Sequence, residues 1–157
     1  MLDRVKEMRS GWLWSFAPLF LWISVIFYLS SSSGSMTETS RFVRPLLTFL
    51  FPSATEDVLI NYHFYIRKLA HITEYAVLGF LAVRAFPGTT SAFAIASLTV
   101  VLVAAADEFN QSFQSSRTSS AGDVLLDCFG GMLAICLYFA TRWYFAKPAG
   151  TSLPSNP

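Results

Sequence analysis

Three separated stretches of the chain carry ionisable and amide side chains at helical spacing. They are "RKLAHITEY" at residues 67–75, "DEFNQ" at 107–111 and "DVLLD" at 123–127. Polar positions three or four residues apart share one face of a helix. In chain order these positions are Lys68, His71, Glu74, Tyr75, Glu108, Gln111, Asp123 and Asp127. Side chains of these types can transfer protons, bind a polar headgroup or hold a hard cation.

The residue types suggest separate roles within this set. His71 and Glu108 can move protons, and together with Asp123 they are the residues predicted to take part in chemistry. Arg117 follows the second stretch, and its guanidinium group can hold a phosphate or a carboxylate. Asp107 lies about 100° around the helix from Glu108 and is left outside the set. The predicted binding residues are therefore Lys68, Glu74, Tyr75, Gln111, Arg117 and Asp127.

Several uses of such a cluster stay open. It could bind or react with a polar headgroup, or it could be a salt-bridge network that joins helices, or it could conduct protons or ions. One imidazole with several carboxylates also suits a divalent cation, although Lys68 and Arg117 disfavour a dense cation site. The sequence therefore leaves the metal, any cofactor and the question of catalysis unknown.

The composition indicates which kind of element must position these side chains. The chain has 157 residues, of which 54% are hydrophobic and only 13% are charged. A soluble domain carries about 25% charged residues. The deficit predicts an integral membrane protein with the lipid bilayer as its main partner. The formal net charge of +1 offers no indication of a nucleic-acid partner.

Four hydrophobic segments predict an all-α membrane protein with four transmembrane helices. Residues 11–30 are long enough to span and longer than the core of a signal peptide. The second span begins near Leu69, within a helix over residues 54–86, and the third and fourth cover residues 92–109 and 123–145. The apolar segment 41–52 is too short to span and is expected at the interface. We expect one membrane domain over residues 1–145 and a disordered tail over 146–157.

Local signals define the connections between these segments. Residues 31–40 are expected to form a polar loop, and residues 86–91 a tight turn that forces an antiparallel hairpin. Ser53 can cap the second helix with Glu56 as partner, and Ser119 or Ser120 can cap the last helix. Gly130 and Gly131 offer a surface for close helix packing. His63 is expected to be solvated or interfacial.

Four spans place both termini on one side of the membrane. With the N-terminus inside, the 11 Lys and Arg residues divide six inside to five outside, a weak positive-inside bias. This predicts that the N- and C-termini are both cytoplasmic. Whatever the orientation, the three polar stretches meet at the same membrane face, because they lie at the same end of their spans.

The polar stretches also resemble the VanZ-like family of small bacterial membrane proteins. The matching pieces are "RKLAHITEYAVLGF", "DEFNQSF", Arg117 and "DVLLDCFGG". Asp127 stands where that family usually has Asn, and the Pro-Gly often found before the Arg is missing. The resemblance implies a plasma-membrane location and a link to low-level resistance to the glycopeptide teicoplanin. It does not imply a reaction.

Three functional hypotheses follow from the cluster and the resemblance. The first is a cell-envelope protein whose outer-face site binds a lipid-linked or peptidoglycan-related polar group. The second is a membrane-embedded hydrolase or transferase acting on a lipid headgroup, with or without a metal. The third is a structural membrane protein with a salt-bridge network.

Overall fold

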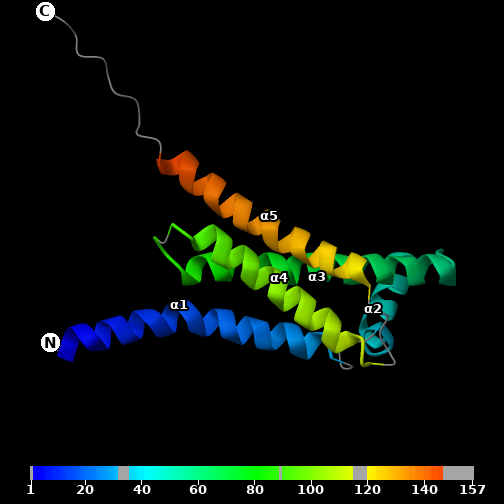
Figure 1. Ribbon diagram of the computed structural model, residues 1–157. Helices are drawn as coiled ribbons and strands as arrows, with labels where there is room; N and C mark the ends of the chain where they lie inside the picture. The colour runs from blue at the N-terminus through cyan, green and yellow to red at the C-terminus, as the bar shows by residue number, and fades with distance from the viewer. Residues whose placement is uncertain (1, 32–35, 89, 115–119, 147–157) are drawn as a thin grey trace, which may run out of the picture.

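Five α-helices make up the part of the chain that the structure describes. The computed structural model describes residues 2–31, 36–88, 90–114 and 120–146, and there is no strand in these ranges (Figure 1). The all-α prediction is confirmed for this part of the chain. In order, the helices are α1 (Leu2–Leu29), α2 (Met36–Leu50), α3 (Glu56–Ala85), α4 (Ala92–Gln111) and α5 (Ala121–Ala146).

Helix α3 is the centre of the bundle. Its 30 residues make it about 45 Å long, and it contacts each of the other four helices. The start of α1, the end of α5 and the α3–α4 turn lie at one end of the bundle, as Figure 1 shows. Helix α2, the end of α4 and the start of α5 lie at the opposite end, which we call the α2 end. The three polar stretches therefore lie toward the α2 end, as the connectivity predicts.

Glycine allows α3, α4 and α5 to pack with their backbones in contact. A Cβ atom added to Gly79 would overlap the carbonyl oxygen of Gly131, and one added to Gly130 would overlap that of Ile72. A Cβ atom on Gly131 would lie 2.5 Å from Cγ1 of Val100 in α4. The predicted close packing at Gly130 and Gly131 is confirmed. It fixes the depth at which α3 and α5 cross, and hence which polar side chains face each other.

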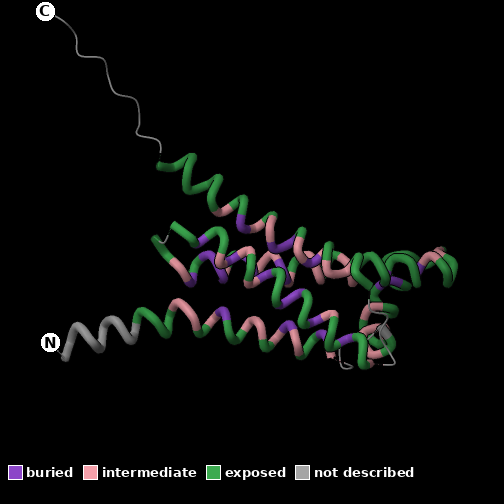
Figure 2. The backbone as a smooth tube through the Cα atoms, in the orientation of Figure 1, coloured by how far each residue is buried: buried purple, intermediate pink, exposed green. Residues whose placement is uncertain are grey.

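The remaining core is apolar and small. Leu78, Val100 and Ile135 are fully buried between α3, α4 and α5, and Ile26 of α1 is buried beside them. Figure 2 shows the buried positions where these helices cross and exposed positions along the outer surface of α5. Many of the exposed side chains are large and apolar. This is expected for a membrane protein, because its helices have lipid rather than water around them.

Three helices are long and apolar enough to cross a membrane. They are Gly11–Leu29 of α1, Ala92–Gln111 of α4 and Ala121–Ala146 of α5, and between 11% and 33% of each apolar window is buried in the protein. Helix α3 is not among them, because Lys68, Glu74 and Arg84 interrupt its apolar stretch. The length and composition of the described helices thus support three of the four predicted spans.

Several element boundaries differ from those expected. Residues 36–40 form the first turn of α2 rather than a loop, with Glu38 favourably placed at the positive end of the helix dipole. Helix α3 begins one residue after Thr55, which is its N-cap, so Ser53 is not the cap. Residues 107–111 belong to the last turns of α4. Ser120 caps α5 as expected, since its Oγ accepts a hydrogen bond from the Gly122 amide at 3.1 Å.

His63 is buried rather than solvated. It is 5% exposed, and its Nε2 lies 3.1 Å from the hydroxyl of Thr39 in α2. Its burial and the nearby charge of Arg67 lower the pKa of His63 below its ordinary value. The expectation of a solvated side chain was wrong because α2 folds back over this face of α3. Of the predicted tail 146–157, Ala146 ends α5 and the rest lies outside the described residues.

Candidate functional site

An ion pair between α3 and α5 lies at the outer edge of the site. Lys68 Nζ donates to Asp123 Oδ1, and the two side chains are 31% and 28% exposed. Lys68 Nζ also lies 5.3 Å from the centre of the Phe64 ring. Close by, a carboxylate oxygen of Glu108 accepts a hydrogen bond from the Ser120 amide. Glu108 thereby ties the end of α4 to the start of α5 and does not point into the bundle.

One turn deeper, an imidazole faces a buried carboxylate. His71 Nδ1 of α3 lies 3.4 Å from Asp127 Oδ1 of α5, and the Asp127 side chain is only 2% exposed. His71 follows Lys68 by three residues and Asp127 follows Asp123 by four, so both pairs cross the same interface at successive turns. Helix α5 therefore presents two carboxylates, one above the other, to the polar face of α3.

The deepest polar group is the carboxylate of Asp107 in α4. Its Oδ2 accepts hydrogen bonds from Ser30 Oγ at 2.6 Å, from Gln111 Nε2 at 2.9 Å and from the Tyr75 hydroxyl at 3.4 Å. Gln111 Nε2 also donates to Ser30 Oγ at 3.1 Å. Asp107 and Tyr75 are fully buried, and Ser30 and Gln111 nearly so. We call these four residues the buried cluster; they join α1, α3 and α4.

Lys68, His71 and Tyr75 form one stripe along α3, which we call the polar stripe. Their spacing of three and four residues places them on one helix face. The side chains of Lys68 and His71 are 31% and 20% exposed, and Tyr75 is fully buried. Tyr75 belongs to both the polar stripe and the buried cluster, because its hydroxyl donates to Asp107 Oδ2, so the two sets form one continuous polar unit. The polar side chains thus lead from the edge of the protein to its interior.

Some polar atoms of this unit are buried but make no hydrogen bond to the described residues. They are His71 Nδ1, Asp107 Oδ1 and Asp127 Oδ1, with Gln114 Oε1 nearby in sequence. The 3.4 Å approach of His71 to Asp127 is close enough for charge attraction but does not meet hydrogen-bond geometry. Buried polar groups in native proteins are nearly always hydrogen-bonded, so each of these atoms is positioned to take a partner such as a water molecule or a ligand.

The structure brings together most of the predicted site residues but arranges them differently from the expectation. Asp107, which the helix angle had excluded, lies at the centre, while Glu108 lies at the edge. Ser30 is absent from the predicted set of site residues. It is the last residue of the first apolar run, and its hydroxyl is buried against Asp107. Asp107 and Gln111 are four residues apart and so share one face of a helix, and this spacing was the sequence signal that could have placed Asp107 in the site. Glu74 is half-buried, and its backbone carbonyl accepts a hydrogen bond from the Trp22 side chain. The predicted binding residue Arg117 lies outside the described residues.

The described residues of the site do not form a metal centre. Within the described ranges, no three His, Cys, Asp or Glu side chains are placed to share an ion. Two hollows lie away from the site, one on α2 and the other between the α3–α4 turn and the end of α5. The described part of the site is therefore a polar cluster with open acceptor atoms rather than a metal cage.

Comparison with protein families gives a clear result. The model of the family described as VanZ/LLP1 matches residues 15–143. The chain belongs to the VanZ/LLP1 family. The VanZ/LLP1 match includes the polar stripe, the buried cluster and both carboxylates of α5. Together with the three apolar helices, it identifies an integral membrane protein. Comparisons with curated proteins and with solved structures gave no match.

Proposed function

We propose that this protein crosses the bacterial plasma membrane four times, with α3 spanning from about Leu69. Residues 69–85 of α3 are about 26 Å long, close to the thickness of the hydrocarbon core. The position of α3 between the other helices supports this, because its polar face contacts protein rather than lipid. In this arrangement both termini are cytoplasmic, the α2 end faces outward, and α2 lies at the interface.

The site at the α2 end binds a polar group of a cell-envelope molecule, such as a lipid-linked or peptidoglycan-related precursor. The observation that carries this proposal is the set of buried, open acceptors, Asp107 Oδ1 and Asp127 Oδ1, at the bottom of the polar stripe. Acceptors of this kind require a donor, so the bound group presents hydroxyl or ammonium hydrogens. Sequestering or repositioning such a molecule would alter teicoplanin susceptibility, which is the phenotype associated with the family.

The residues of the site have different roles in binding at different depths. The ion pair of Lys68 with Asp123 marks the entrance, where both side chains keep partial contact with solvent. His71 and Asp127 lie on opposite sides of the next layer and can orient the ligand. Asp107 is held by Ser30, Gln111 and Tyr75 through one oxygen, which leaves the other oxygen directed to a ligand.

The test pairs Asp127→Ala with Asp57→Ala, an exposed position near the start of α3. Each variant is expressed in a deletion strain, and teicoplanin susceptibility and co-purified lipid-linked precursor are measured at equal protein levels. Losing a hydrogen bond to a charged group costs about 1.5–3 kcal/mol, so Asp127→Ala should weaken retention by about tenfold or more. Asp57→Ala should match the wild type. The proposal fails if deletion leaves both susceptibility and envelope composition unchanged.

A second candidate function is a membrane-embedded hydrolase or transferase that acts on a lipid headgroup. The approach of Asp127 to His71 Nδ1 favours it, because a carboxylate in that position orients an imidazole as a general base. His71→Ala should then abolish turnover of headgroup substrates by the folded, reconstituted protein, and Asp127→Ala, which removes the carboxylate that faces the imidazole, should do the same. Retained turnover in both variants, or no turnover by the wild type, argues against this function.

A further inference from the structure

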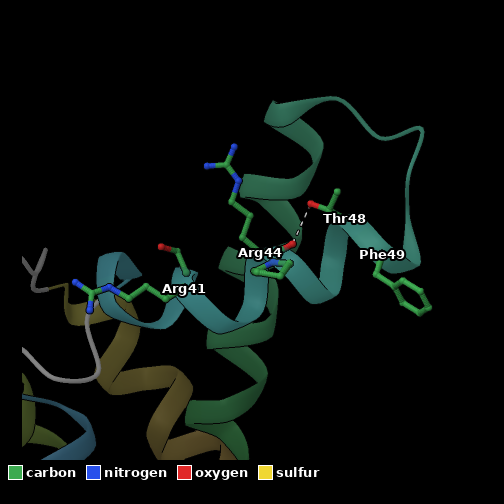
Figure 3. A pocket seen from close by; sticks show the side chains of 6 residues that line it. Arg41, Arg44, Thr48 and Phe49 are labelled. Atoms are coloured by element: carbon green, nitrogen blue, oxygen red, sulfur yellow. Dashed lines mark hydrogen bonds between the residues drawn. The ribbon is translucent and has the colours of Figure 1, made fainter.

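Helix α2 carries a hollow with two arginines at its rim. The hollow is shallow and open, has a volume of about 630 Å³, and is lined by Ser40, Arg41, Arg44, Pro45, Thr48 and Phe49 of this one helix. Figure 3 shows Arg41 and Arg44 at its edges, with the guanidinium groups directed to different sides. The hydroxyls of Ser40 and Thr48 donate to backbone carbonyls of their own helix, at 2.7 Å and 3.0 Å. The donors available to a ligand are therefore those of the arginines.

Both arginines have carboxylate partners that a phosphate group can replace. Arg44 lies 2.6 Å from Glu56, and Arg41 lies 3.4 Å from Glu38. All four side chains are between 43% and 70% exposed. Exposed ion pairs contribute little net stability, so exchanging one costs little. Each of these contacts uses a single nitrogen of a guanidinium group that has five N–H donors, and this group matches a phosphate in two-point geometry.

The same helix presents an apolar face to its surroundings. Phe42, Leu46, Phe49 and Leu50 are between 55% and 81% exposed, and their spacing of four, three and one residues places them on one side of α2. Leu47 is buried on the other side, where α2 packs on α3. A helix with an apolar face beside basic residues, at one end of a membrane bundle, is suited to the boundary between acyl chains and headgroups.

We infer that α2 binds the phosphate of an anionic phospholipid at the membrane surface. The acyl chains of the lipid cover Phe42, Leu46 and Phe49, while its phosphate lies in the hollow and takes the place of Glu38 or Glu56 on the guanidinium group that turns toward it. This site is separate from the polar stripe and the buried cluster, since none of its lining residues belongs to either. It rests on the proposed position of α2 at the membrane interface but not on the ligand proposed for the polar stripe.

The experiment measures lipid binding to the full-length protein in detergent by native mass spectrometry. Dioleoylphosphatidylglycerol and dioleoylphosphatidylcholine are the two lipid probes. A hydrogen bond to a charged group contributes about 1.5–3 kcal/mol, so Arg41→Gln with Arg44→Gln should weaken phosphatidylglycerol binding by about tenfold or more. Phosphatidylcholine has the same phosphodiester, but its choline cation is repelled by the arginines, so its binding should be weaker and should change less. The control is Arg84→Gln with Arg142→Gln, which removes the same charge from exposed positions at the opposite end and should bind both lipids like the wild type.

Two further measurements distinguish a membrane lipid from free phosphate. Phe42→Ser with Phe49→Ser removes exposed apolar contacts without touching the arginines, and it should weaken phosphatidylglycerol binding several-fold. Inorganic phosphate should compete only weakly, because it has no acyl chains to cover the apolar face. The inference is overturned if the arginine pair and its control bind phosphatidylglycerol equally. It is also overturned if the phenylalanine variant is unaffected and inorganic phosphate competes fully.

Discussion

The two oxygens of Asp107 have different surroundings. One accepts from Ser30, Gln111 and Tyr75, and the other accepts no hydrogen bond from the described residues. A carboxylate held by one oxygen is fixed in position, and under our proposal its other oxygen is preorganised for the ligand.

Ser30→Ala tests how firmly the buried cluster joins α1 to α4. The Ser30 hydroxyl donates to Asp107 and accepts from Gln111, so its removal leaves a buried donor and a buried acceptor each short of a partner. We expect a loss of about 1–2 kcal/mol in the free energy of unfolding, measured by denaturation in mixed micelles. Ser24→Ala, which removes an exposed hydroxyl bonded within α1, is the matched control. Equal stability of the two variants would show that the cluster contributes nothing to this contact.

His63 predicts a pH dependence at the contact of α2 with α3. The folded-state pKa lies below the ordinary value of 6.5, so the unfolded chain binds more protons in the acid range. The stability that His63 contributes is therefore complete above about pH 6.5 and falls as the pH decreases below it. His63→Gln cannot titrate at this position. The wild type should lose stability relative to His63→Gln between about pH 7.5 and about pH 5.5, and parallel curves would contradict this.

At the scale of helices, the crossing of α3 and α5 decides which polar groups meet. Contact of Gly79 with Gly131, and of Gly130 with Ile72, sets both the depth and the closeness of this crossing. The pairs Lys68–Asp123 and His71–Asp127 then follow at successive turns toward the α2 end. A small shift of one helix would separate both pairs, so this backbone contact beside His71 and Asp127 controls the geometry of the site.

Gly130→Ala should therefore impair the site from a position that bears no polar side chain. The added methyl group would meet the backbone carbonyl of Ile72, which cannot move without moving α3. Overpacking of this kind costs about 1–3 kcal/mol, and we expect this loss together with weaker precursor retention. Gly11→Ala is the control, because a methyl group added there in α1 would have nothing within 4 Å of it. If both variants have wild-type stability, the backbone contact is not close.

Exchanging charges between Lys68 and Asp123 separates a structural role from a binding role. Lys68→Asp and Asp123→Lys should each destabilise the α3–α5 contact by placing like charges together. The double variant restores an ion pair and should recover most of the stability, measured by thermal unfolding. Under our proposal it does not recover precursor retention, because the charge at the entrance is reversed on each helix. Recovery of both properties would favour a purely structural network.

At the scale of the whole molecule, the surface is organised for a membrane. The outward faces of α1, α4 and α5 are apolar, and exposed aromatic residues lie at both ends of the bundle. Trp12 and Trp14 of α1 and Trp143 and Tyr144 of α5 are exposed at the end opposite α2, and amphipathic rings of this kind favour a membrane interface. The α2 end also carries the polar stripe and the two arginines of α2. The two ends of the bundle therefore differ in their polar groups.

The number of spans can be decided by the location of the termini. Four spans place both termini in the cytoplasm, whereas three spans, with α3 outside the bilayer, place them on opposite sides. Reporter fusions after residue 157 and before residue 1 should both show cytoplasmic activity. A reporter inserted after Ser53, between α2 and α3, should show the external signal. Termini on opposite sides would exclude α3 as a span.

The sequence by itself determined the all-α class, the order of the helices and the end of the bundle at which the polar stretches meet. These follow from local spacing and connectivity, which do not depend on how helices rotate about their axes. It also indicated the contact surface of Gly130 and Gly131, because small residues in an apolar helix allow the backbone of a neighbouring helix to approach closely.

Only the tertiary structure decided which acidic residue of α4 points inward and which partners it has. Asp107 and Glu108 are adjacent, so a rotation of about 100° exchanges their positions, and the hydrophobic pattern of an apolar helix in lipid does not fix that rotation. The rotation is set by contacts with α1, α3 and α5, which are far away in sequence. The same applies to Ser30 and His63, whose burial depends on helices that pack against them from other parts of the chain.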